Sequence, residues 1–168
     1  FVAGGRAYMA GRPGLSVLDV SDPANPVKEG ELAIEEARGV HVIYPNAYVN
    51  APSDVPLSVV DISDPAAPAA TSRSEEPTQI NGTHVAGNSL YMVSEERIWV
   101  YDVGADPEEP PLVSSYPVAT RIDLLAHGDL LFATGSDTFT VIDATDPANL
   151  TEAGSCTLAE GDPGVTYG

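Results

Sequence analysis

The sequence of 168 residues has little positive charge and few of the patterns that identify a ligand class. It contains one lysine, Lys28, and six arginines against 25 acidic residues, for a formal net charge of −18. Nucleic-acid binding through clustered Lys and Arg is therefore excluded. The single cysteine, Cys156, cannot form an internal disulfide, and no Cys/His cluster indicates structural zinc. No apolar run approaches the roughly 20 residues of a membrane helix.

The excess of acidic residues has two interpretations. A surface rich in Asp and Glu and poor in Lys suits high salt, where repulsion between carboxylates is screened, and this predicts a halophilic protein. Alternatively, a GC-rich genome favours codons for Ala, Gly, Pro, Asp and Arg. Neither interpretation identifies a ligand.

The two ends of the chain resemble interior segments of a longer pattern. The sequence starts at Phe1 rather than Met, and no charged region followed by an apolar one indicates a signal peptide. Both 1–3 and 164–168 have strand-like sequences. We therefore expect the chain to be part of a longer polypeptide, so the missing signal says nothing about export.

The strongest pattern is an internal repeat. An apolar segment ending in Asp recurs four times, with this Asp at positions 19, 61, 102 and 143. Each copy is followed by an Asp-Pro pair, with its Asp at 22, 64, 106 and 146. The carboxylate of such a pair can cap backbone N–H groups, and the proline fixes φ near −65°. Each copy is thus predicted to be a strand followed by a tight turn.

A second motif has the same period: a short apolar run, a turn, and a run with an aromatic residue. Its copies are 2–8, 42–48, 85–91 and 126–132, and the last two contain Gly-Asn and Gly-Asp, which favour hairpins. Each period therefore holds about four strands. In the second unit we predict them at 39–44, 46–50, 57–63 and 68–74.

Four strands in a period of about 41 residues predict an all-β fold, a β-propeller of four-stranded antiparallel blades. Within one propeller region the predicted blades are about 1–36, 37–79, 80–120 and 121–163, and 164–168 starts or closes a blade. In one arrangement 164–168 closes a four-bladed ring. In the other, which we favour, the chain is an arc of a larger propeller, and the exposed blade faces and edges at its ends favour self-association.

The segment 14–27, Gly-Leu-Ser-Val-Leu-Asp-Val-Ser-Asp-Pro-Ala-Asn-Pro-Val, resembles the LVIVD repeat. The resemblance covers essentially the whole chain in four copies. The third copy departs from the pattern, because Gly104 and Ala105 are inserted before its Asp-Pro pair. The resemblance implies a β-propeller of bacterial or archaeal proteins that are often exported or attached to the cell surface. It implies no catalytic motif.

The repeated aspartates and two histidines are the first candidates for a site. Eight regularly placed carboxylates could offer the hard oxygens that Ca²⁺ needs. However, each pair falls in a different blade without further local ligands, so turn caps are the favoured interpretation and we expect no metal or cofactor. His41 and His84 share a repeat position near the predicted axis, where imidazoles could bind metal or act as a base. Leu125 and Thr166 occupy this position in the other copies, so a structural role is favoured.

Loops that enter the first strand of each blade are expected to converge on one face of the propeller. With the histidines, they supply the predicted ligand-binding set, which consists of Arg38, His41, Asn81, His84, Arg121 and Asp123. Asn149 and Asn81 also fit the Asn-x-Ser/Thr glycosylation pattern, and Asn149 is the better candidate.

No nucleophile motif, phosphate loop or metal-ligand run is present, which favours a non-enzymatic function. We predict an extracellular or cell-surface scaffold whose loop face binds protein or polysaccharide. One alternative is a structural subunit of an extracellular assembly that associates through blade edges. Another is a propeller hydrolase or lyase with carboxylates and His41 or His84 at the axis.

Overall fold

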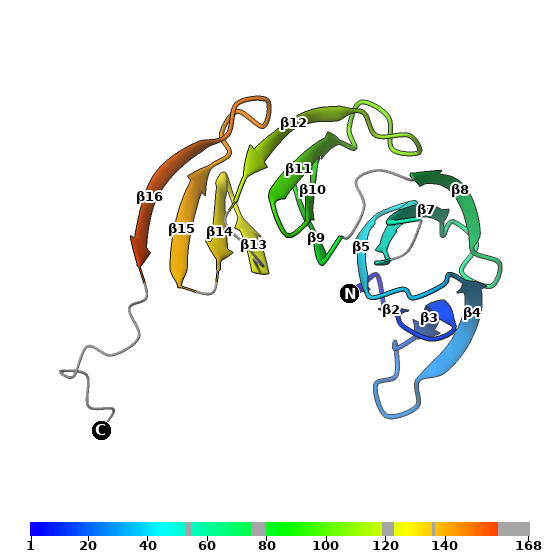
Figure 1. Ribbon diagram of the computed structural model, residues 1–168. Coiled ribbons are helices and arrows are strands. Elements are labelled where there is room, and N and C mark those ends of the chain that lie inside the picture. Colours follow the sequence, from blue (N-terminus) through cyan, green and yellow to red (C-terminus); the bar gives the residue numbers. More distant parts are fainter. Residues whose placement is uncertain (53–54, 75–79, 119–122, 136, 158–168) are drawn as a thin grey trace, which may run out of the picture.

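The computed structural model describes residues 1–52, 55–74, 80–118, 123–135 and 137–157, which form strands and turns without a helix. The strands make four antiparallel sheets of four, and within each sheet the strands are neighbours in chain order. Figure 1 shows the sheets following one another along an arc. The predicted all-β architecture of four-stranded antiparallel repeats is thus confirmed.

The four sheets are numbered here in chain order. Sheet 1 contains β1 (Val2–Ala3), β2 (Arg6–Ala10), β3 (Gly14–Asp19) and β4 (Val27–Ala33). Sheet 2 contains β5 (Gly39–Ile43), β6 (Asn46–Asn50), β7 (Leu57–Asp61) and β8 (Ala69–Ser74). Sheet 3 contains β9 (Gly82–Ala86), β10 (Ser89–Val93), β11 (Arg97–Asp102) and β12 (Leu112–Pro117). Sheet 4 contains β13 (Asp123–His127), β14 (Leu130–Thr134), β15 (Thr138–Asp143) and β16 (Thr151–Thr157).

The repeated aspartates are turn caps. The Asp61 carboxylate accepts the backbone N–H of Ser63 at 2.8 Å, and the Asp64 carboxylate accepts that of Ala66 at 3.0 Å. The same pattern recurs in the other sheets. These hydrogen bonds hold the pKa of Asp61 below its usual value. The sequence interpretation of these residues as turn caps is confirmed.

Three hydrophobic clusters fill the spaces between successive sheets. We call the side of a sheet that is turned toward the next sheet its forward face, and the opposite side its backward face. In sheets 1 to 3 the forward face buries three equivalent side chains: Tyr8, Leu15 and Val17; Tyr48, Leu57 and Val59; Tyr91, Ile98 and Val100. In sheets 2 to 4 the backward face buries four: Ala47, Val49, Val60 and Ile62; Leu90, Met92, Tyr101 and Val103; Leu131, Ala133, Ile142 and Ala144. The apolar alternation along each strand therefore forms an interface repeated three times.

Each Asp-Pro turn after the first packs against the preceding sheet. An added Cβ on Gly30 in β4 would lie 2.2 Å from the carbonyl oxygen of Pro65, so this turn needs a glycine beneath it. The Tyr48 hydroxyl donates to the carbonyl of Pro107 at 2.9 Å. The Ser114 hydroxyl donates to the carbonyl of Pro147 at 2.6 Å. The turns thus join neighbouring sheets as well as neighbouring strands.

The arc is open. Strand β5 lies against β9, and β9 lies against β13, but no comparable packing joins the described parts of sheets 1 and 4 (Figure 1). Residues 164–168, which close the ring in the four-bladed alternative, fall outside the part of the chain that the structure describes. None of the described segments is a helix long and apolar enough to cross a membrane.

Candidate functional site

Strands β5, β9 and β13, the first strands of sheets 2 to 4, lie on the concave side of the arc (Figure 1). One side chain from each of these strands, together with Phe1 directly before β1, forms a row. Its members pair in register with the aromatic residue of the adjacent second strand. The row consists of Phe1, His41, His84 and Leu125, opposite Tyr8, Tyr48, Tyr91 and Phe132 respectively. The regular repeat period therefore places one side chain from each sheet at an equivalent register position on the first strand or directly before it.

Three members of this row have their rings close together. The ring centroids of Phe1 and His41 are 5.9 Å apart, and those of His41 and His84 are 5.4 Å apart, both in tilted arrangements. Phe1 is 48% exposed and Leu125 is 60% exposed, whereas both histidines are partly buried. The row thus has two imidazoles at its centre and an accessible apolar side chain at each end.

The two imidazoles are held in the neutral form at neutral pH. Burial lowers the pKa of His41, and the neighbouring His84 lowers it further. Burial also lowers the pKa of His84, against the opposing effect of the Asp123 carboxylate. The two imidazoles therefore add no positive charge to the row at neutral pH.

These shifts predict a dependence of stability on pH. Because the pKa of each histidine in the folded state lies below its usual value of about 6.5, the unfolded chain takes up protons first as the pH falls. The stabilisation that comes from keeping the two histidines neutral is fully present above about pH 6.5 and is lost progressively at lower pH. We expect the free energy of unfolding, measured in urea, to fall between about pH 7 and pH 5, and to fall less in His41→Gln. His127→Gln, which changes an exposed histidine at the end of β13, is the matched control. Equal slopes in the two variants would contradict the assignment.

The remaining predicted ligand-binding residues lie at the ends of these strands or outside the described chain. Arg38 and Asn81 are exposed and directly precede β5 and β9, and Asp123 is the first residue of β13. The structure brings His41 to His84 and places His84 within the electrostatic influence of Asp123, whereas no hydrogen bond or ion pair joins the Arg38 or Asn81 side chain to another residue in the described part of the chain. Arg121 falls outside the described residues. Asn149 and Asn81 are both exposed, and their glycosylation stays a prediction.

A buried amide lies at the same ends of β5 and β9. The Asn50 side chain is 1% exposed, and its oxygen accepts a hydrogen bond from the Thr83 hydroxyl at 3.1 Å. A Cβ on residue 39 would lie 2.3 Å from this oxygen, so a residue larger than Gly39 would displace the Asn50 side chain. The Asn50 amide nitrogen has no hydrogen-bond partner among the described residues. A buried donor of this kind is costly unless it has an acceptor.

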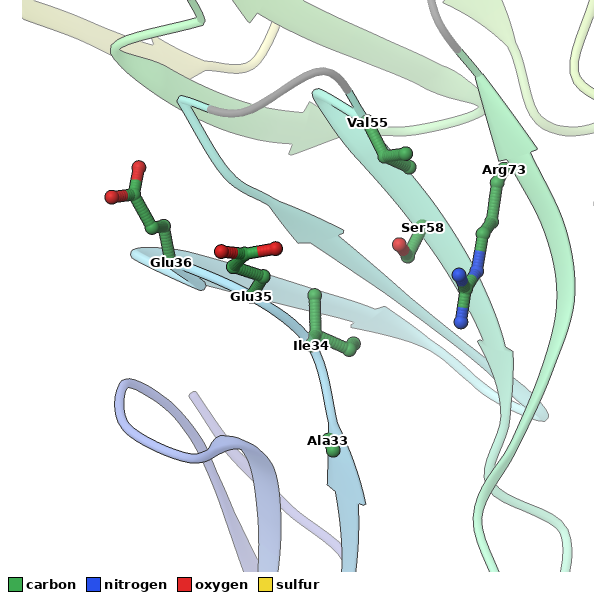
Figure 2. A pocket seen from close by; sticks show the side chains of 7 residues that line it. All are labelled: Ala33, Ile34, Glu35, Glu36, Val55, Ser58 and Arg73. Atoms are coloured by element: carbon green, nitrogen blue, oxygen red, sulfur yellow. The ribbon is translucent and has the colours of Figure 1, made fainter.

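The loop face contains a cavity of about 360 Å³ between sheets 1 and 2. Figure 2 shows Glu35 and Glu36 projecting from the segment after β4, with Arg73 of β8 on the other side and Ser58 of β7 between them. Glu36 has a φ of 55°, a left-handed conformation that is uncommon for residues other than glycine. Val55, from the loop between the second and third strands, completes this wall. Residues of the linker before β5 and of the loop before β7 therefore line one cavity, and none of them belongs to the predicted ligand-binding set.

The sequence reasoning missed several of these residues. Phe1 belongs to the row because its backbone pairs with Tyr8, and aligning the aromatic residues of the second strands would have placed it there. Asn50, Glu35 and Arg73 have no repeated counterpart of the same type, so a search for repeated motifs does not select them. Among the described residues no group of three or more His, Cys, Asp or Glu is arranged to hold a metal ion.

The family model of the LVIVD repeat matches the chain at residues 1–33, 36–74 and 123–158. The unmatched part includes the third copy, which carries the insertion at Gly104 and Ala105. No curated protein matched the sequence.

Solved structures with the same fold are similar over most of this chain. A protein of unknown function from Desulfotomaculum acetoxidans has a TM-score of 0.66 at 15% identity, covering 84% of this chain and 48% of its own. PorZ, described as a surface component of the type-IX secretion system of Porphyromonas gingivalis, has a TM-score of 0.59 at 21% identity over 90% of this chain and 20% of its own. The WD40 domain of SCAP from fission yeast has a TM-score of 0.52 at 15% identity over 74% and 32%. The chain thus spans less than half the length of each, and the likeness is one of fold.

Proposed function

Since the chain belongs to the LVIVD repeat family, we propose that it is a non-enzymatic binding module of an extracellular or cell-surface β-propeller protein. Its ligand is a protein segment that docks on the row formed by Phe1, His41, His84 and Leu125. PorZ, a similar structure, is described as a bacterial surface component, which supports the proposed location.

The exposure of the row is the observation that carries this proposal. Phe1 and Leu125 are large apolar side chains left accessible at the two ends of a row that contains a pair of partly buried imidazoles, and exposed apolar groups on a concave surface are typical of interaction sites. The net charge of −18 favours approach of a positively charged partner. We therefore expect a basic segment with an aromatic or aliphatic anchor for the row.

Selection of displayed random peptides on the chain tests this function. The selected peptides are expected to be rich in Lys and Arg and to carry an apolar anchor. Leu125→Ser is expected to weaken their binding about tenfold, the size of effect expected when an apolar anchor contact of an interface is truncated. Leu112→Ser is the matched control, because Leu112 is 52% exposed on the outer strand β12, and its binding is expected to stay within about twofold of the wild type.

Three outcomes would overturn parts of the proposal. Peptides that bind Leu125→Ser as tightly as the wild type would remove the row from the binding surface. A failed peptide selection, together with polysaccharide binding that Leu125→Ser weakens, would assign the row to polysaccharide. Turnover of an ester or a polysaccharide that is lost in His84→Gln and kept in His127→Gln would make the chain an enzyme.

A further inference from the structure

Among the described residues, no sheet covers the forward face of sheet 4 or the backward face of sheet 1, which are the two halves of the repeated interface. On the forward face of sheet 4, the positions that are buried in the other sheets are occupied by Phe132, Phe139 and Val141, which are only partly buried. The rings of Phe132 and Phe139 are stacked with centroids 6.2 Å apart. The equivalent side chains of sheet 1, Leu15 and Val17, are 0% exposed because sheet 2 covers them.

The backward face of sheet 1 is the matching half. Its four positions are occupied by Ala7, Met9, Leu18 and Val20, the equivalents of Ala47, Val49, Val60 and Ile62 in sheet 2. Met9 is 57% exposed, whereas Val49 is 0% exposed. A groove of about 180 Å³ runs beside Met9 and Leu18 on this sheet. Both faces are therefore apolar in the pattern that the chain itself buries three times.

The Asp-Pro turns show the same complementarity. Gly154 in β16 is the equivalent of Gly30, because each faces the valine at the bulge of its sheet, Val141 and Val17 respectively. Gly30 is packed under the turn at Pro65, whereas a Cβ on Gly154 would meet nothing within 4 Å. The turn at Pro23, in sheet 1, is the one Asp-Pro turn with no preceding sheet in the described chain. In the described chain, sheet 4 thus has an open site above Gly154 where an Asp-Pro turn could pack, and the Asp-Pro turn of sheet 1 packs against no preceding sheet.

We propose that the 168-residue chain self-associates head to tail, with the forward face of sheet 4 of one copy packed on the backward face of sheet 1 of another. Phe132, Phe139 and Val141 then meet Met9, Leu18 and Val20, and the Pro23 turn sits over Gly154. Such a heterologous contact closes into a ring when the rotation allows it. Two arcs of four sheets make eight, which is within the range of known propellers.

Sedimentation velocity over chain concentrations from micromolar to several hundred micromolar tests the assembly. We expect a transition from 17.5 kDa to twice that mass. Because each chain carries a charge of −18, association is expected to be tighter in 1 M salt than in dilute buffer. A mass of 17.5 kDa at every concentration and in both buffers would overturn the proposal.

Two variants test the two ends separately. Gly154→Leu fills the open site on β16 where the Pro23 turn of another copy would pack, and Met9→Glu places a charge in the backward face of sheet 1. Each is expected to raise the dissociation constant at least tenfold without lowering the melting temperature of the monomer, since both side chains project from uncovered faces. Leu112→Ser, at an exposed position of β12 away from both faces, is expected to associate like the wild type.

Mixing the two variants gives the sharpest result. The Gly154→Leu chain keeps an intact sheet 1 face, and the Met9→Glu chain keeps an intact sheet 4 face, so an equimolar mixture is expected to form a heterodimer through one normal interface. Cys156, which is exposed on the same face as Gly154, reports on this contact, and its reaction with a maleimide is expected to slow several-fold on association. Dimers that survive in both single variants, or a mixture that stays monomeric, would contradict head-to-tail packing.

Discussion

Replacing Gly30 by alanine is expected to lower the free energy of unfolding by about 2–3 kcal/mol, the usual cost of forcing an extra carbon into a packed site. The added Cβ would lie 2.2 Å from the carbonyl oxygen of Pro65 and 2.9 Å from the Pro68 ring. Neither is the end of a flexible side chain, so sheet 1 and sheet 2 must move apart. Urea unfolding of the wild type and the variant measures the difference.

Gly154→Ala is the matched control for this prediction. Gly154 has the same place in its own sheet, but the site of its Cβ is open. In a strand, alanine is favoured over glycine by about 0.5–1 kcal/mol, so this variant is expected to be at least as stable as the wild type. A Gly30→Ala protein as stable as Gly154→Ala would mean that the Pro65 turn does not pack on β4.

Ile98→Ala is expected to destabilise the chain by about 3–4 kcal/mol, within the range for replacing a buried large aliphatic side chain by alanine, which leaves a cavity. Ile98 is 0% exposed and lies in the cluster between sheets 3 and 4. Phe139 has the equivalent position in sheet 4, where no described segment covers it fully. Phe139→Ala is therefore expected to cost only about 1 kcal/mol, because little buried area is lost.

The comparison is made by urea unfolding at a chain concentration near 1 µM, the low end of the range proposed for sedimentation velocity, where self-association is expected to be weakest. Equal losses of stability in Ile98→Ala and Phe139→Ala would contradict the prediction. That result would mean that burial at this position does not depend on the following sheet.

Most of the fold follows from local chemistry and was accessible from the sequence. The spacing of Asp61 and Asp64 indicates a strand and a turn, and the hydrogen bonds of both carboxylates confirm it. The predicted strands 39–44, 46–50 and 68–74 agree within a residue with β5, β6 and β8. The third prediction, 57–63, is two residues too long. Ile62 continues the apolar pattern because it packs between sheets 1 and 2, although the ladder with β8 ends at Asp61.

The candidate site was less accessible because it depends on how the sheets are placed relative to one another. The repeat frame paired His41 with His84, and the structure brings their rings together. Placing Phe1 in the row requires the pairing register of β1 with β2, and a strand of only two residues gives a weak sequence signal for that register. The cavity beside Glu35 and Arg73 forms between two sheets, so neither residue carries a local signal.

The seating of each Asp-Pro turn on the sheet before it has a consequence for synthesis on the ribosome. Ser114 and the Pro147 carbonyl that it binds are 33 residues apart in the chain. The outer strand of a sheet therefore emerges well before the turn that covers it, and the newest sheet is always incomplete while translation continues. Folding in the cell must lag behind elongation by about one repeat, and the most recently made outer strand is the part of the nascent chain that a chaperone would find exposed.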